Sequence, residues 1–126
     1  MATTYFLAAT GSDGGSGTIA SPWFTLEKVF ASASFGDTIY MRGGTYAYTS
    51  QQDIIGKSGT ASALINLWAY PGETPIITRY SSYIPTIGVQ TDLIYMENCS
   101  YLHIKGIDIS YYTQSATLDY WFAFRG

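Results

Sequence analysis

The sequence has little of what would indicate a nucleic-acid-binding, membrane or disulfide-linked protein. Charged residues make up only 12% of the chain, the net charge is −3, and the six Lys and Arg are scattered rather than gathered in a basic stripe. No apolar run approaches the ~20 residues that span a bilayer. We therefore expect neither a nucleic-acid nor a membrane partner. Cys99 is the only cysteine, so no internal disulfide forms and we expect a small, half-buried apolar side chain there.

Signals for export and for metal binding are also missing. The first residues, MATTYFLAA, have no basic region and too short an apolar stretch for a secretory signal. His103 is the only histidine, and the aspartates lie far apart in the sequence. A calcium site needs about six oxygen ligands, usually with several converging carboxylates. We predict no metal site in this chain. The glycine-rich stretch 11–17 lacks the Gly-Lys-Ser/Thr ending of a phosphate-binding loop, so we exclude that reading too.

Aromatic residues and glycines are abundant instead, with 12 Tyr and 13 Gly in 126 residues. This composition and length favour one β-rich domain over residues 1–126. A short strand is expected at 5–9. One helix is expected at 22–34, with Ser21 as its N-cap, Pro22 in its first turn and Gly36 ending it, because apolar residues recur there at three- and four-residue spacing.

After Gly36 the hydrophobic period changes to two, which is typical of strands. Inward-facing pairs are expected at Ile39/Met41, Ile65/Leu67, Ile94/Met96, Leu102/Ile104 and Ile107/Ile109. Glycine, proline and asparagine separate these runs, but no two-residue hairpin turn connects them. The final LDYWFAFRG alternates as a further strand, with Trp121, Ala123 and Arg125 opposite Phe122 and Phe124.

Short strands without hairpins predict an all-β solenoid, a coiled ribbon in which each strand pairs in parallel with the strand one coil away. Counting from Ile39 to Ile65 and from Ile65 to Ile104 gives intervals of 26 and 39 residues, so the second coil needs a longer loop, expected at 78–92. Residues 5–35 would form a strand, a loop and a helix that caps the N-terminal end. Residues 36–126 would form about three coils, with an uncapped C-terminal end.

The order of these motifs resembles a known family. The stretches YFLAATGSDGGSGTIASPWFTLEKVF, GDTIYMRGGTY, SGTASALINLWAYPGETPII and SYLHIKGIDIS are similar to the N-terminal portion of right-handed parallel β-helix proteins, closest to the pectate-lyase-like polysaccharide lyases of family 9. The resemblance implies an extracellular or periplasmic parent protein. It also implies that calcium and a lysine base act in the full-length family, in coils further along than this chain reaches. No position here matches them, so no catalytic residue is carried over.

The stacked strands would align one row of outward side chains. This candidate carbohydrate-binding face consists of Tyr40, Arg42, Asn66, Trp68, Tyr70, His103 and Lys105. Aromatic rings pack on sugar rings, and a cation can pair with a uronate carboxylate. The alternative is purely structural: Arg42 stacks on Trp68 and the remaining residues form a solvated face. Further aromatic candidates in loops are Tyr80, Tyr83, Tyr111 and Tyr112.

Three functions remain open. The first is the cap and first coils of a polysaccharide-active β-helix protein, non-catalytic alone and able to bind acidic polysaccharide weakly. The second is a small β-helix module that self-associates through its uncapped C-terminal coil. The third is a minimal lyase acting by β-elimination, for which Lys105 and Arg42 are weak candidates as the base, because a cationic side chain can remove a proton only after losing its own.

Overall fold

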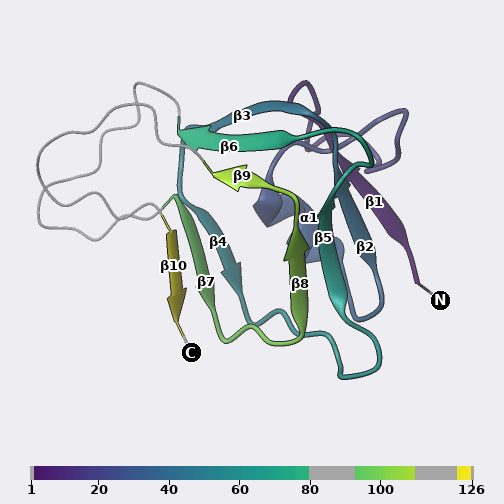
Figure 1. The fold of residues 1–126 in the computed structure, drawn as a ribbon, viewed down its shortest axis with the longest axis vertical. Coiled ribbons are helices and arrows are strands. Elements are labelled where there is room, and N and C mark those ends of the chain that lie inside the picture. The colour runs from purple at the N-terminus through teal and green to yellow at the C-terminus, as the bar shows by residue number, and fades with distance from the viewer. Residues whose placement is uncertain (1, 80–92, 110–121, 126) are drawn as a thin grey trace, which may run out of the picture.

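The computed structural model describes residues 2–79, 93–109 and 122–125. In this part of the chain it contains one α-helix and ten strands, coloured from purple to yellow in Figure 1. Their bounds are β1 (Thr4–Leu7), α1 (Leu26–Ser32), β2 (Thr38–Met41), β3 (Gly44–Tyr48), β4 (Gln52–Ile55), β5 (Ile65–Ala69), β6 (Pro75–Arg79), β7 (Ile94–Glu97), β8 (Leu102–Lys105), β9 (Asp108–Ile109) and β10 (Phe122–Arg125).

The strands form three parallel sheets. From β2 onward, paired strands are three positions apart along the chain, whereas β1 pairs with the next strand, β2. The sheet orders are β1-β2-β5-β8, β3-β6-β9 and β4-β7-β10, and Figure 1 shows β2, β5 and β8 side by side. All seven strand pairings in the described residues are parallel. The expectation of parallel stacking without hairpins is therefore confirmed. Parallel pairing at this interval is the pattern of a chain wound repeatedly around one axis.

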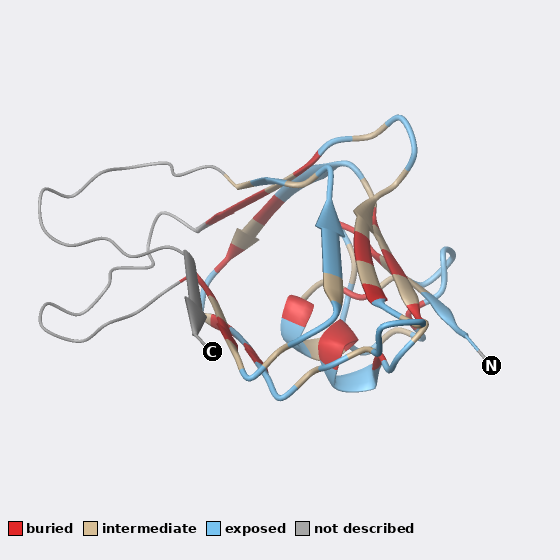
Figure 2. Cartoon of the chain, turned by 60° about the horizontal axis from the view of Figure 1, so that its bottom comes forward, coloured by how far each residue is buried: buried red, intermediate tan, exposed pale blue. Residues whose placement is uncertain are grey.

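Buried and partly exposed residues alternate along β2 and β5, as the alternation of apolar and polar residues in the sequence predicted. Ile39 and Met41 of β2 are fully buried, and Ile65 and Leu67 of β5 are at most 3% exposed. The residues between them are partly exposed. Figure 2 shows buried positions alternating with more exposed ones along the strands. The core lies between the three sheets because successive side chains of a strand point to opposite faces.

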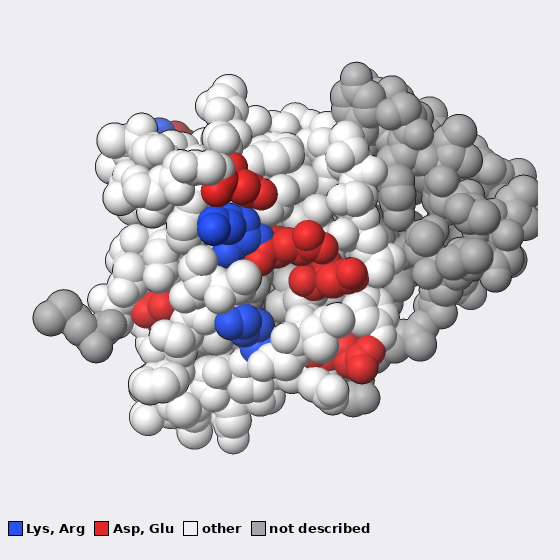
Figure 3. Space-filling model, turned by 180° about the vertical axis from the view of Figure 1, so that it is seen from behind, with Lys and Arg blue, Asp and Glu red and all other residues white. Residues whose placement is uncertain are grey.

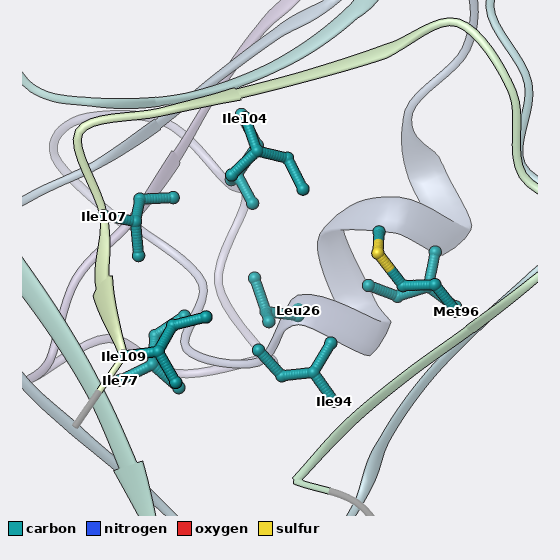
Figure 4. A pocket seen from close by; sticks show the side chains of 9 residues that line it. Leu26, Ile77, Ile94, Met96, Ile104, Ile107 and Ile109 are labelled. Atoms are coloured by element: carbon teal, nitrogen blue, oxygen red, sulfur yellow. The ribbon is translucent and has the colours of Figure 1, made fainter. Parts of the chain in front are cut away.

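A small apolar pocket of about 20 Å³ lies at the centre of the core, between α1 and the inner faces of the sheets (Figure 4). Its lining residues are Leu26, Ile54, Leu67, Ile77, Ile94, Met96, Ile104, Ile107 and Ile109. The expected inward position of Ile104 is confirmed, yet its side chain is 39% exposed. It belongs to β8, the last strand of its sheet.

The structure sets the register between the strands. Ile39 lies beside Leu67, and Ile65 lies beside Leu102. Paired residues are therefore 28 (67−39) and 37 (102−65) residues apart, where the sequence suggested intervals of 26 and 39. The difference of two preserves which side chains face inward, because the strand period is two.

Sequence reasoning missed β3, β4 and β6. Two tyrosines on β3 are among the most buried side chains of the protein: Tyr46 is 0% exposed and Tyr48 is 1% exposed. Their hydroxyl groups donate hydrogen bonds to the carbonyls of Leu7 and Phe24, both at 3.0 Å. The predicted inward-facing pairs were alternating aliphatic residues, so these two tyrosines were not recognised as such a pair. The predicted loop at 78–92 begins later than expected, since Thr78 and Arg79 belong to β6, and 80–92 lie outside the described residues.

The helix is shorter than predicted, Leu26–Ser32 instead of 22–34, and its N-cap is Thr25 rather than Ser21. Trp23 cannot be helical because its backbone N–H donates to the Phe6 carbonyl and its carbonyl accepts from Ala8. The Thr25 hydroxyl accepts from the Lys28 N–H at 3.2 Å and donates to Asp13 at 2.6 Å. The helix ends at Ser32 with Ala33 as C-cap, before the Gly36 that was expected to end it.

The first strand is tied to the segment after the helix by a buried carboxylate. Asp37 is 3% exposed and accepts hydrogen bonds from the Thr3 N–H at 2.7 Å and the Ser34 N–H at 2.9 Å. The helix itself packs against β4, the first strand of the third sheet, and buries Leu26, Val29 and Phe30. These contacts join the residues before β1 to the segment after α1, and join α1 to β4.

The two candidate caps give a first prediction. Thr25→Ala removes both hydroxyl hydrogen bonds at the helix start and should lower the free energy of unfolding by about 1 kcal/mol. Ser21→Ala, on the residue that sequence alone marked as the cap, should change it by less than about 0.5 kcal/mol. Urea unfolding followed by circular dichroism measures both. An equal loss in the two variants would contradict the assignment of Thr25.

Candidate functional site

The outward side of the β1-β2-β5-β8 sheet gathers all seven residues predicted to form a binding face. The register aligns Tyr40 with Trp68 and Trp68 with Lys105, and places Asn66 beside His103. Tyr70 and Arg42 follow directly after β5 and β2. One further residue belongs to the row: Phe6 of β1, which aligns with Tyr40. We call these eight residues the aromatic face.

Phe6 was missed although a signal for it was present. It lies inside the strand predicted at 5–9, between the half-buried Tyr5 and the buried Leu7. Had that strand been placed in the same stack as β2, alternation alone would have put Phe6 on the outward side.

The rings of the aromatic face contact one another continuously. Phe6 and Tyr40 stack with ring centroids 5.9 Å apart. Tyr40 meets Tyr70 and Trp68 edge to face at 5.8 and 6.3 Å. All four rings are partly exposed. Rings at such distances stabilise one another beyond their buried area, and their exposed parts offer an apolar surface across neighbouring strands.

Arg42 is already paired within the protein. Its Nε and Nη2 donate to the two carboxylate oxygens of Glu73 at 2.8 and 3.1 Å, and its guanidinium lies 4.4 Å from the centroid of the Tyr70 ring. The structural alternative had Arg42 stacked on Trp68, and that contact was wrong, because Arg42 lies over Tyr70. The register explains why, since Arg42 comes one residue after the pair Met41–Ala69 and so lies level with Tyr70.

Glu73 is held ionised by its neighbours. The hydrogen bonds from Arg42, and next the one from the Gly43 N–H at 2.9 Å, lower the pKa of Glu73 to about 2, and the same carboxylate raises the pKa of Arg42. Sequence reasoning gave no role to Glu73, which lies 31 residues from Arg42. A bidentate arginine–carboxylate pair of this kind neutralises the charge of Arg42.

The other cation of the aromatic face has different surroundings. Lys105 lies with its Nζ 5.4 Å from the centroid of the Trp68 ring. In the part of the chain that the structure describes, Arg42–Glu73 is the only ion pair, so Lys105 has no carboxylate partner there. The Trp68 Nε1–H donates a hydrogen bond of 3.1 Å to Nδ1 of His103. Both Lys105 and His103 are exposed.

Neither weak candidate for a catalytic base is in surroundings that favour that role. A base must first be neutral. Arg42 is held charged by Glu73, and Lys105 is exposed rather than enclosed in an apolar pocket. Over residues 2–79, 93–109 and 122–125, no group of three or more His, Cys, Asp or Glu side chains is placed to hold a metal ion.

Buried tyrosines shape the turn that presents Arg42. The Tyr46 hydroxyl donates to the Arg42 carbonyl at 2.6 Å as well as to Leu7. Burial raises the pKa of Tyr46 and of Tyr48 above the usual tyrosine value, so both hydroxyls stay protonated and act as donors. The loop candidates Tyr80, Tyr83, Tyr111 and Tyr112 lie outside the described residues.

Charged side chains of both signs are mixed on the side of the molecule seen in Figure 3, where Lys and Arg are interspersed with Asp and Glu rather than separated into one area of a single sign. The helix contributes Glu27, which accepts from the Asp53 N–H, and Lys28, whose Nζ lies 5.2 Å from the Trp23 ring centroid. No helix of the described chain is long and apolar enough to cross a membrane.

Comparison with known proteins agrees with this fold. A 77-residue stretch is 46% identical to the pectate lyase PEL9 of Emericella nidulans, covering 61% of this chain but only 18% of that protein. Among solved structures, a rhamnogalacturonan lyase superposes with a TM-score of 0.73 at 28% identity, over 85% of this chain and 28% of that one. Pectate lyase Pel9A shares the fold, with a TM-score of 0.62 at 19% identity, over 83% and 27%.

The chain thus spans less than a third of each of these relatives. The family model described as the Pel9A-like, right-handed β-helix region matches residues 5–123. That match confirms the resemblance inferred from the sequence motifs. This chain is a member of the Pel9A-like right-handed β-helix family.

Proposed function

We propose that this chain forms the first layers of a polysaccharide-active β-helix protein and that its aromatic face binds acidic polysaccharide. The observation that carries the proposal is the aromatic face itself: partly exposed rings of β1, β2 and β5 in contact with one another, with cations at its edges. The family and the two relatives named as pectate and rhamnogalacturonan lyases support the choice of ligand class.

The layout of the coils supports the same reading. We take β2–β4, β5–β7 and β8–β10 as about three coils, preceded by β1 and α1. The helix packs against β4, the edge strand of its sheet, and buries apolar side chains that would otherwise face solvent. In this arrangement β1 and α1 cap the N-terminal end, while the aromatic face runs along the stack from β1 to β8.

Binding without catalysis is the better supported role for these residues. Stacking on a sugar ring needs only exposed aromatic surface, which the face has, whereas β-elimination needs a base that is neutral. A lyase activity of the whole protein, with calcium, belongs to our proposal for the longer parent and not to the residues described here. We propose the same for its export to the cell exterior or periplasm.

Trp68 is the ring through which the proposal is best tested. Trp68→Ala removes a ring that contacts Tyr40, His103 and Lys105, and should weaken binding of polygalacturonate or rhamnogalacturonan about tenfold, a loss of ~1.4 kcal/mol. Affinity electrophoresis or isothermal titration calorimetry measures the change.

The matched control is Phe35→Ala. Phe35 is an aromatic residue that is 62% exposed and lies in the turn before β2, outside the aromatic face. Its removal should leave the affinity unchanged. The proposal fails if the wild-type chain binds neither polymer, or if Phe35→Ala and Trp68→Ala reduce binding equally.

Glu73 determines whether Arg42 can contribute to binding. Because the pKa of Glu73 is lowered to about 2 from its ordinary 4.5, the ion pair stabilises the fold fully above pH 4.5 and this contribution disappears as the pH falls toward 2. Nuclear magnetic resonance titration of the Glu73 carboxyl carbon should give a midpoint near 2.

In Glu73→Gln the guanidinium of Arg42 is released, so affinity for an acidic polysaccharide at neutral pH should rise by about twofold to fivefold, the range of an exposed charge contact. A midpoint near 4.5 in the wild type would show that the Arg42–Glu73 pair does not form in solution. Unchanged affinity in the variant would show that a released Arg42 does not contact the polysaccharide.

Self-association is a second candidate function, favoured by one observation. Ile104 faces the apolar pocket from the last strand of its sheet, but is 39% exposed. An apolar side chain in this position can be covered by a second copy of the chain. Light scattering over a hundredfold range of protein concentration should then show the mean mass rising with concentration. A constant monomer mass would exclude this second function.

A further inference from the structure

Trp68 organises two polar side chains of β8. The register sets His103 beside Asn66 and Lys105 beside Trp68, so both side chains stand on the outward side of β8, two residues apart. The imidazole meets the indole edge to face at 5.8 Å between ring centroids, and the ammonium lies 5.4 Å from the same indole centroid. One ring therefore contacts both groups.

The hydrogen bond from Trp68 determines the tautomer of His103. An indole N–H can only donate, so Nδ1 of His103, 3.1 Å away, must accept. In the neutral imidazole the proton then lies on Nε2, which becomes a hydrogen-bond donor. Since no hydrogen bond of Nε2 is present among the described residues, His103 has a donor available for a ligand.

Lys105 supplies the positive charge next to this donor. It is exposed and lacks a carboxylate partner in the described chain, whereas the charge of Arg42 is neutralised by Glu73. The aromatic face is therefore electrostatically uneven. Its Arg42 end is neutral overall, and its β8 end carries an unpaired cation together with a neutral donor.

We propose that His103 and Lys105 form the subsite that binds the carboxylate of an acidic sugar, and that Trp68 positions both side chains. The carboxylate accepts from Nε2–H of His103 and from the ammonium of Lys105, while the sugar ring packs on exposed aromatic surface of the same face. This inference rests on the proposed carbohydrate binding and assigns acidic-sugar selectivity to β8 rather than to Arg42.

Two oligosaccharides of equal length separate charge recognition from ring stacking: an oligogalacturonate, and the same oligomer with its carboxyl groups reduced to alcohols. The wild-type chain should prefer the acidic oligomer, and Lys105→Gln should weaken binding of that oligomer roughly threefold to tenfold while leaving the reduced oligomer unaffected. The preference of the wild type should shrink as sodium chloride is added, because exposed charges are screened.

Lys28→Gln is the matched control. It removes the same charge from a lysine that lies over a tryptophan at nearly the same distance, Trp23 at 5.2 Å, but on the helix. It should leave binding of both oligomers unchanged. An equal loss of acidic binding in Lys28→Gln and Lys105→Gln would mean that only net charge matters, and would overturn the subsite.

Trp68→Phe tests the positioning step, because it retains a ring and removes only the N–H donor. The ¹⁵N resonances of His103 should show the proton on Nε2 in the wild type and a mixture of tautomers in this variant. Preference for the acidic oligomer should fall roughly twofold to fivefold, with binding of the reduced oligomer retained. His103→Phe should reduce the preference similarly.

The two proposals fail in different ways. If the wild-type chain binds neither oligomer, the proposed function and the subsite both fail. If it binds both oligomers equally, and Lys105→Gln, His103→Phe and Trp68→Phe change neither, carbohydrate binding stands and the carboxylate subsite is wrong. If Arg42→Gln alone abolishes acidic selectivity, the selectivity belongs to the other end of the face.

Discussion

Parallel pairing of strands three apart in the chain is the constraint on which the rest of the structure depends. Backbone hydrogen bonds hold β2, β5 and β8 in a defined register, and each side chain is thereby aligned with one from the layers above and below. Inward rows become the apolar core and outward rows become a surface with one residue per layer. A shift of one residue in any pair would exchange these two sides, so the core and the aromatic face are two consequences of the same register.

Side-chain carboxylates hold the backbone around β1 and α1 in place. Asp37 joins the N–H groups of Thr3 and Ser34, and Asp13 accepts from the N–H groups of Phe24 and Thr25. Partial burial works against ionisation of Asp13, but its hydrogen bonds with Thr25 and Phe24 and the charge of Lys28 outweigh it and lower the pKa of Asp13. Buried polar groups that lack partners are costly, and these carboxylates satisfy backbone donors that the irregular segments leave free.

The aromatic face shows why a family assignment and a binding site require separate arguments. Right-handed β-helices carry many activities on one architecture, and the part of each relative that this chain matches is only 18% to 28% of that relative's length. What distinguishes this chain is local: an arginine neutralised by Glu73 at one end of the row, and a lysine without a carboxylate partner among the described residues at the other. Two cations that look equivalent in the sequence therefore differ in what they can offer a ligand.

Alternation of apolar and polar residues was enough to assign the inward and outward sides of β2, β5, β7 and β8, because the two-residue period is a property of the strand backbone itself. The seven residues expected on one face lie there for that reason. Tertiary structure alone decided the register, the Tyr70 and Glu73 partners of Arg42, the Thr25 cap and the burial of Tyr46 and Tyr48. Each of these features depends on which residues, distant in the sequence, come into contact when the chain folds. Loop lengths and hydrogen bonds between layers determine those contacts, and the local periodicity of the sequence does not.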